Sequence, residues 1–275
     1  MNPFAISSIL IVVTNVFLGV FVLWKKGDDK LNKLRVIWFL VCLFIVFWGT
    51  LGYKISTANS EAEAFSWWHW FYIGPIFIPV FFYHFVYHFL QLKSKEKRYK
   101  YILFSVYALA LFFWQFSLFF PERFAGDLNL FFGHIYTPSF NSANPTIFLF
   151  YVSFYWFLLA YAFFLLFKAF KNSTGIIRNQ LKYFIFGSIL GWFGPHGFWL
   201  MYFNVHIYPY TNFLIVIYPF IFTYAILKYQ LMDIKLIIKK AFFYSVGVGL
   251  VGGFITTITF LSYWFVANIP GFKFW

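Results

Sequence analysis

The chain is 275 residues long, with 62% hydrophobic residues, 11% charged residues and a formal net charge of +13. Soluble domains carry about 25% charged residues, and a core of this size cannot hide 46 phenylalanines, 20 tyrosines and 12 tryptophans from water. Together with a mean hydropathy of +0.75, this composition excludes a water-soluble globular domain and indicates a protein whose surface is solvated mainly by lipid.

Eight apolar runs are each long enough to cross a hydrocarbon core of about 30 Å as a helix. The runs are uniformly apolar instead of alternating, which favours helices over barrel strands. The first run has no basic region before it, so we interpret it as a membrane helix and not as a cleaved signal. The predicted fold class is all-α, a polytopic transmembrane helix bundle. Its eight predicted spans are residues 4–24, 36–53, 70–92, 100–120, 146–168, 181–203, 210–228 and 241–266.

The lysines and arginines predict the orientation of these spans. The odd-numbered connectors hold 18 of the 21 basic residues, because only Lys54, Arg123 and Lys273 lie elsewhere. Basic residues accumulate in cytoplasmic loops, so we expect the N-terminus outside and the odd-numbered connectors in the cytoplasm. The predicted location is the bacterial cytoplasmic (inner) membrane. The net positive charge then serves topology and anionic lipid headgroups, with the lipid bilayer and not nucleic acid as the partner.

Two outer connectors differ from the others in composition. Residues 54–69 end in "FSWWHW", an aromatic belt of the kind found at headgroup level. Residues 121–145 form the longest connector, and a loop of that length is more often functional or mobile than merely connective.

The third span offers a candidate metal site in "FYHFVYHF", where His84 and His88 lie one helical turn apart. Two imidazoles at this spacing can bind a metal. The chain has no second HxxxH, so we interpret the pair as residues that form hydrogen bonds between helices. All eight acidic residues fall in connectors, which argues against ion-coupled transport. We predict no catalytic residue, no metal and no cofactor.

The sixth span contains "GSILGWFGPHGFWLMY", in which Pro195 lacks a backbone donor and three glycines surround it. This pattern predicts a kink, and Pro75, Pro79 and Pro219 are further candidates for kinks. Polar groups among indoles at a kink can form a small-molecule pocket. The alternative is a simple hydrogen bond between two polar side chains, or from one of them to a carbonyl. The predicted ligand-binding residues are His196, Trp192 and Trp199 of the sixth span and Gln115 and Trp114 of the fourth.

The eighth span carries small residues at every fourth position, beginning with Ala241 and including a GxxxG motif. Such a stripe allows two helix backbones to approach closely. The partner helix can belong to this chain or to a second copy, so a homodimer is one prediction. The predicted helix-packing residues are Ser245, Gly249, Gly253 and Thr257.

Four segments carry a resemblance to a known family. "YAILKYQLMDI", residues 224–234, resembles the end of the N-terminal seven-transmembrane (sensor) region of bacterial sensor histidine kinases, where the seventh span leads into an A-I-x-K-Y-x-L-x-D-I element. Three other segments are similar to earlier parts of that region in the same order. They are "NVFLGVFVLWKKGDDKLNKLRVIWFL", "IGPIFIPVFFYHFVYHFL" and "RNQLKYFIFG". The resemblance covers about residues 1–240.

The resemblance implies a membrane-embedded sensory module that passes a signal to a histidine-kinase region. It implies a signal-coupling role for Lys228, Tyr229 and Asp233, and for Arg178 and Gln180 at the start of the sixth span. We expect residues 1–240 to form the seven-transmembrane sensor-like region and residues 241–275 to form an eighth transmembrane helix with a short outer tail. No kinase core follows within the chain. We therefore expect it not to be an enzyme and interpret it as a fragment, with the kinase region beyond a further span or in a separate signalling partner.

Two other functions compete with a sensor. One is a standalone small-molecule or lipid-binding membrane carrier. The other is an integral membrane enzyme that modifies lipid, with His84, His88 or His196 as a metal ligand or base. For a sensor, the stimulus can be a lipid, a hydrophobic signal molecule, a peptide at the outer loops, or the state of the membrane.

Overall fold

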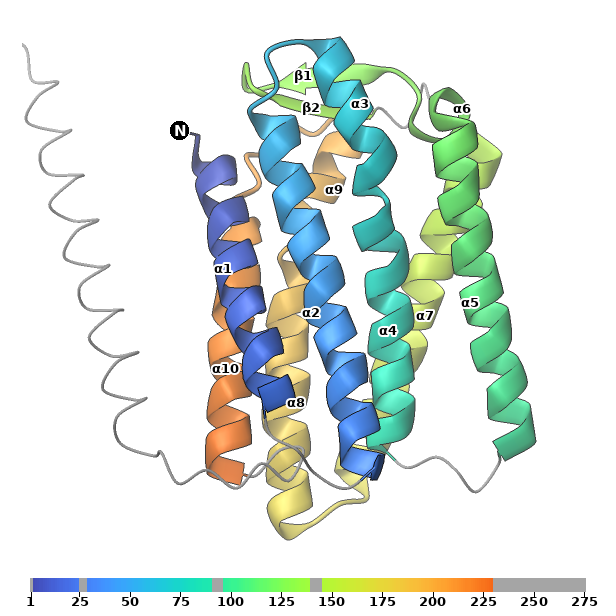
Figure 1. The fold of residues 1–275 in the computed structure, drawn as a ribbon, viewed down its shortest axis with the longest axis vertical. Coiled ribbons are helices and arrows are strands. Elements are labelled where there is room, and N and C mark those ends of the chain that lie inside the picture. The colour runs from blue at the N-terminus through green and yellow to red at the C-terminus, as the bar shows by residue number, and fades with distance from the viewer. Residues whose placement is uncertain (1, 25–28, 91–95, 139–144, 230–275) are drawn as a thin grey trace, which may run out of the picture. The chain divides into compact units, whose positions relative to one another are not determined.

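The computed structural model describes residues 2–24, 29–90, 96–138 and 145–229, all within a compact unit that spans Met1–Ile234. Apart from one short hairpin, the regular elements of these residues are helices (Figure 1), which confirms the predicted all-α membrane bundle. Five helices are long and apolar enough to cross a membrane, and they correspond to the first five predicted spans. The eighth predicted span lies outside the described residues.

The first four spans form helices that are longer than predicted or are divided. The helix bounds are α1 (Pro3–Trp24), α2 (Asp29–Ser56), α3 (Glu61–Phe71), α4 (Ile73–Phe89) and α5 (Glu96–Phe119). Because α2 begins at Asp29, Lys33 and Arg35 belong to a helix and not to the first connector. Basic side chains near a helix end can still extend toward the headgroups.

The aromatic connector before the third span is largely helical instead of a loop. Ser60 caps α3, since its side chain accepts a hydrogen bond from the Glu63 N–H at 3.2 Å. The Glu63 carboxylate accepts in turn from the Asn59 N–H at 2.9 Å, which resembles a capping box. The helix is interrupted at Tyr72. Pro75 has no N–H, so it cannot donate the helical hydrogen bond to the Phe71 carbonyl four residues earlier.

The second half of the bundle contains α7 (Pro145–Lys171), α8 (Gly175–Phe193), α9 (His196–Tyr202), the 3₁₀ helix η2 (Tyr210–Phe213) and α10 (Leu214–Tyr229). The predicted kink in the sixth span is confirmed as a break, because α8 ends at Phe193 and α9 begins after Pro195. Thr211 stabilises this break: its hydroxyl donates to the Gly194 carbonyl at 2.8 Å and accepts from the Gly197 N–H at 3.1 Å.

The long connector 121–145 contains structure that the sequence did not predict. It forms α6 (Pro121–Ala125) and an antiparallel hairpin of β1 (Leu128–Phe131) and β2 (Ile135–Pro138). Phe132 and Gly133 in the turn both have positive φ, at 54° and 73°, which is the geometry of a type I′ turn. The hairpin lies at the end of the bundle where the chain begins (Figure 1), and Trp68 Nε1 of α3 donates to the Tyr136 carbonyl at 3.0 Å.

Tyr208 joins three segments at this same end. Its hydroxyl accepts from the Phe4 N–H of α1 at 3.0 Å and lies 3.2 Å from His134 Nε2 of the hairpin turn. Burial raises the pKa of the Tyr208 hydroxyl, so the group keeps its proton and can donate to the imidazole. The hairpin is therefore tied both to α1 and to the segment before η2.

The helices pack through small residues and a few buried polar groups. α2 contacts α1 and α4, and α8 contacts α10. The contact between α8 and α10 is close, because a Cβ added at Gly187 would lie 2.7 Å from the Phe222 ring. The Tyr218 hydroxyl of α10 donates to Asn15 Oδ1 of α1, and such buried bonds help specify which helix faces meet.

Candidate functional site

Residues of seven helices of the bundle surround one cavity with about 850 Å³ of space not occupied by atoms, the open space at its mouth included. Side chains from α2, α4, α7, α8, α9 and α10 form the wall, together with Phe71 and Tyr72 at the break between α3 and α4. The cavity therefore lies where both divided helices, α3–α4 and α8–α9, change direction.

The wall is much more aromatic than the chain as a whole. Four tryptophans, five tyrosines and four phenylalanines make up 13 of its 21 residues, whereas aromatic residues are 28% of the sequence. The general excess of phenylalanine in the chain does not explain this concentration. The aromatic residues are Trp38, Trp48, Trp192, Trp199, Tyr72, Tyr151, Tyr155, Tyr202, Tyr218, Phe71, Phe82, Phe198 and Phe222.

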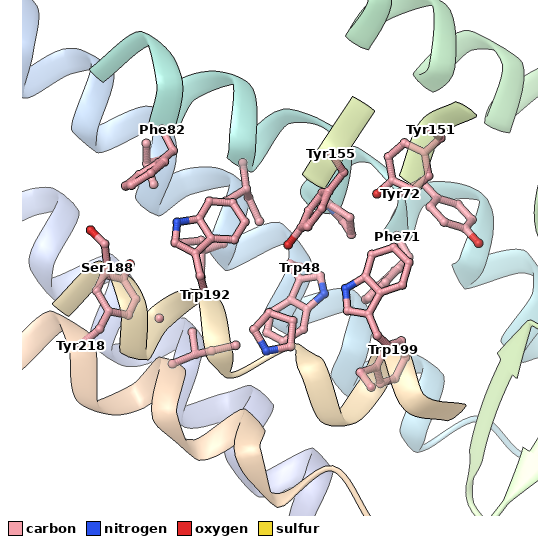
Figure 2. A pocket seen from close by; sticks show the side chains of 18 of the residues that line it. Trp48, Phe71, Tyr72, Phe82, Tyr151, Tyr155, Ser188, Trp192, Trp199 and Tyr218 are labelled. Atoms are coloured by element: carbon pink, nitrogen blue, oxygen red, sulfur yellow. The ribbon is translucent and has the colours of Figure 1, made fainter. Parts of the chain in front are cut away.

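The two sides of the cavity have different contacts. On one side, the Trp38 ring of α2 stacks on Phe222 of α10 with centroids 4.5 Å apart. On the other side, the Tyr72 and Tyr202 hydroxyls lie 3.2 Å apart. Figure 2 shows Ser188 and Tyr218 on the first side and Tyr72 and Tyr151 on the second, with aromatic rings in the space between them.

Tyr155 enters this space from α7. Its ring centroid lies 5.7 Å from that of Trp192 and 5.5 Å from that of Trp199, as Figure 2 shows. The tyrosine therefore brings α7 into contact with both α8 and α9, on either side of the Pro195 break.

Three polar groups on lining residues are buried and have no hydrogen-bond partner among the described residues. They are Trp38 Nε1, the Tyr151 hydroxyl and Ser188 Oγ, on side chains that are 2%, 1% and 4% exposed. A buried polar group without a partner costs about 1–3 kcal/mol, and most such groups in proteins are paired. No lysine, arginine, histidine or acidic residue lines the cavity.

The prolines of the bundle add further polar capacity to the same wall. A proline has no N–H, so the carbonyl four residues before it receives no α-helical hydrogen bond. For Pro75, Pro79, Pro195 and Pro219, that carbonyl belongs in each case to a lining residue. These residues are Phe71, Pro75, Gly191 and Ile215.

The structure brings together two of the five predicted ligand-binding residues. Trp192 and Trp199 both line the cavity, whereas His196 is not among the lining residues. The His196 Nδ1 lies 3.1 Å from the Phe193 carbonyl oxygen, and its ring lies 5.1 Å from the Trp156 ring.

Gln115 and Trp114 also lie away from the cavity wall. Gln115 is exposed on α5. The Trp114 ring lies 6.0 Å from that of Phe77, and its Nε1 is buried without a hydrogen-bond partner among the described residues. Gln115 and Trp114 therefore do not share a surface with Trp192 and Trp199.

The predicted signal-coupling residues within the described part of the chain lie at one end of the bundle. Lys228 and Tyr229 end α10, and Arg178 and Gln180 lie near the start of α8 (Figure 1). The Arg178 guanidinium lies over the Phe170 ring, 5.1 Å from its centroid. Asp233, together with Ser245, Gly249, Gly253 and Thr257, lies outside the described residues.

His84 of α4 contacts a neighbouring helix, and His88 lies beside it in the same helix. His84 Nδ1 lies 2.8 Å from the Tyr107 hydroxyl of α5, and the His84 and His88 ring centroids are 4.9 Å apart. Among the described residues, no group of three or more histidine, cysteine or acidic side chains could hold a metal ion.

Most of the cavity wall was not predicted from the sequence, including Trp38, Tyr151, Tyr155 and Ser188. One signal was available, because Ser188 is a small polar residue within an apolar span. A second signal was the four prolines Pro75, Pro79, Pro195 and Pro219, because a residue of the cavity wall lies one helical turn before each of them. The aromatic residues themselves could not be selected, since similar residues also cover the lipid-facing surface, as Phe157 does at 73% exposure.

The fold is that of a polytopic membrane protein with an internal cavity lined mainly by aromatic residues. The family model described as the N-terminal 7TM region of histidine kinase matches residues 7–235. The chain belongs to this family, and its bundle is therefore a membrane region associated with histidine kinases. No curated protein and no solved structure matches the chain.

Proposed function

We propose that the chain is the signal-input module of a histidine-kinase-type signal transduction protein, and that occupancy of the aromatic cavity is its input. The observation that carries this proposal is the double role of α10. Ile215, Tyr218 and Phe222 of α10 form part of the cavity wall, and the same helix leads into the end of the family match at residue 235. A ligand that displaces these side chains acts directly on the segment that contains the coupling residues.

The contacts between α8 and α10 supply a physical route for this coupling. Gly187 of α8 lies against Phe222 of α10, which stacks on Trp38. Because no space remains between Gly187 and Phe222, movement of Phe222 displaces α8 as well. Closely packed elements shift between discrete arrangements instead of deforming continuously. The displacement reaches the starts and ends of these helices, where a kinase region or a separate signalling partner receives it.

We further propose that the end of the bundle opposite the hairpin is cytoplasmic and that the N-terminus is outside. The starts of α2, α5 and α8 and the ends of α7 and α10 share that end (Figure 1). Basic residues occur near each of these helix ends, including Lys33, Lys100, Lys171, Lys182 and Lys228. This distribution supports the orientation, because basic residues accumulate on the cytoplasmic side.

Reporter fusions test the orientation. A reporter inserted at residues 91–95 should report the cytoplasm, and one inserted at residues 139–144 should report the exterior. The opposite result at both positions would place the coupling residues outside the cell and would overturn the proposed route to a kinase.

Cavity-filling substitutions test the coupling without a known ligand. Ser188→Phe adds a ring on the cavity face of α8, and Ile189→Phe adds one to a neighbouring residue that is 43% exposed. Amide hydrogen exchange is then measured over Leu214–Tyr229 in both variants. We expect Ser188→Phe to change exchange in α10, including its last turns, and Ile189→Phe to leave it unchanged. Equal exchange profiles for the two variants would overturn the coupling.

A further inference from the structure

We infer that the cavity binds an uncharged molecule with a flat ring system and a carbonyl or hydroxyl oxygen. The inference deepens the proposed function and rests on it only in treating the cavity as a binding site. Three properties of the wall carry it: the absence of charge, the concentration of aromatic rings, and the buried polar groups that lack partners.

The absence of charge selects against ionic ligands. No lysine, arginine, histidine, aspartate or glutamate lines the cavity, so an ion held there would lose its hydration without gaining a counter-charge. Transfer of an unpaired ion into an apolar environment is strongly unfavourable. The preferred ligand is therefore neutral and soluble in the membrane or in its interface.

The aromatic wall selects a flat ring. Rings line the cavity on opposite sides, from Tyr218 on one side to Tyr72 and Tyr151 on the other (Figure 2). Stacked and edge-to-face contacts between aromatic rings are favourable beyond the area that they bury. An aliphatic chain of equal area makes no such contacts, so a planar ligand binds this wall more tightly.

The unpartnered groups select an oxygen on the ligand. An indole Nε1 can only donate a hydrogen bond, so Trp38 requires an acceptor. Ser188 lies one helical turn after Phe184, whose ring centroid is 5.8 Å from that of Trp38. Figure 2 shows Ser188 on the side of the cavity opposite Tyr151. A ligand carbonyl or hydroxyl oxygen can accept from the Trp38 indole or from the Ser188 hydroxyl and remove the cost of leaving that group unpaired.

Three probes with one ring system test these requirements separately. 2-Naphthol is neutral at pH 7 and carries an oxygen, naphthalene has no oxygen, and 2-naphthoate is an anion. Binding of each to the full chain in lipid nanodiscs is measured by titration and by the rise in melting temperature. We expect 2-naphthol to bind about tenfold more tightly than naphthalene, as one net hydrogen bond predicts. We expect 2-naphthoate not to bind at concentrations at which 2-naphthol saturates the cavity.

Substitutions identify the hydrogen-bonding groups. Trp38→Phe and Ser188→Ala should each weaken 2-naphthol binding several-fold, up to about tenfold, and leave naphthalene binding unchanged. Trp24→Phe is the matched control, because Trp24 is 83% exposed at the end of α1. Ser188→Ala keeps the test decisive if Trp38→Phe prevents folding, since it removes a single oxygen atom.

Each outcome separates the inference from the proposed function. Equal binding of 2-naphthol and naphthalene would overturn the oxygen requirement, and tighter binding of 2-naphthoate would overturn the requirement for a neutral ligand. Tighter binding of 1-decanol than of 2-naphthol would overturn the flat ring. If none of the probes binds but Ser188→Phe still alters exchange in α10, the inference fails and the coupling stands. Binding of 2-naphthol without any change in α10 would leave the inference intact and overturn the proposed function.

Discussion

A single methyl group at Gly187 should disturb both the stability of the bundle and its cavity. A Cβ at this position would lie 2.7 Å from Cε2 and 2.8 Å from Cδ2 of Phe222. The Phe222 ring is fully buried and stacks on Trp38 with centroids 4.5 Å apart. The ring therefore cannot move away from the new methyl group without disturbing a second aromatic side chain of the cavity wall.

The expected loss in stability follows from two opposing terms. Overpacking of a well-packed interior costs about 1–3 kcal/mol, whereas replacing a helical glycine with alanine gains about 0.5–1 kcal/mol. For Gly187→Ala, the net loss in the free energy of unfolding is therefore about 0–2.5 kcal/mol. Gly52→Ala in α2 provides the control, because its Cβ would meet Ser8 and Phe4 at ordinary contact distances of 3.5–3.7 Å. Gly52→Ala should therefore stabilise the protein by about 0.5–1 kcal/mol.

The free energy of unfolding can be measured by titration with a denaturing detergent and followed by near-ultraviolet circular dichroism, which reports aromatic packing. Binding of 2-naphthol to the folded variants should fall for Gly187→Ala and remain unchanged for Gly52→Ala. A Gly187→Ala protein that is as stable as Gly52→Ala and binds the probe normally would refute the close contact between α8 and α10.

Three further substitutions test individual contacts. Tyr218→Phe removes the hydroxyl that donates to Asn15 and should cost about 0.6 kcal/mol, the average for hydrogen bonds between membrane helices, and at most about 1.7 kcal/mol. The double variant with Asn15→Leu should lose less than the sum of the two single variants, and strict additivity would argue against the bond. His84→Phe removes the hydrogen bond to Tyr107 and should destabilise the bundle by a similar amount without altering its zinc or iron content, whereas loss of a stoichiometric metal would reveal a metal site. Gly249→Ile tests the predicted small-residue stripe of the eighth span: we expect a change in oligomer size or stability, and an unaltered protein would remove the stripe from consideration as a packing surface.

The division of the sixth span shows how far local sequence chemistry extends. Pro195 predicted a kink because its missing N–H breaks the helical ladder, and the break between Phe193 and His196 confirms that reading. The same local chemistry favoured His196 as a pocket residue. The direction of the His196 side chain depends instead on how α9 begins after Pro195, and this geometry places Trp199 on the cavity wall.

Local composition was sufficient to predict the class of the protein. Long apolar runs must become helices in lipid, because every backbone N–H and C=O then finds a partner within its own segment. The first five spans, the kink at Pro195 and the membership of a histidine-kinase membrane family followed from local composition and motifs. These are properties of single segments, so they do not depend on how the segments meet.

Only the tertiary structure decided which aromatic residues form the cavity. A soluble helix reveals its inner face by its polar outer face, but these spans are apolar on all sides because lipid solvates the outside. Trp38 and Phe157 therefore look alike in the sequence, although one is 2% exposed and the other 73% exposed. Close approach at small residues, the breaks at Tyr72 and Pro195, and the buried Asn15–Tyr218 bond select the inner faces. The close contact of Gly187 with Phe222 and the Asn15–Tyr218 bond join residues that are distant in the chain.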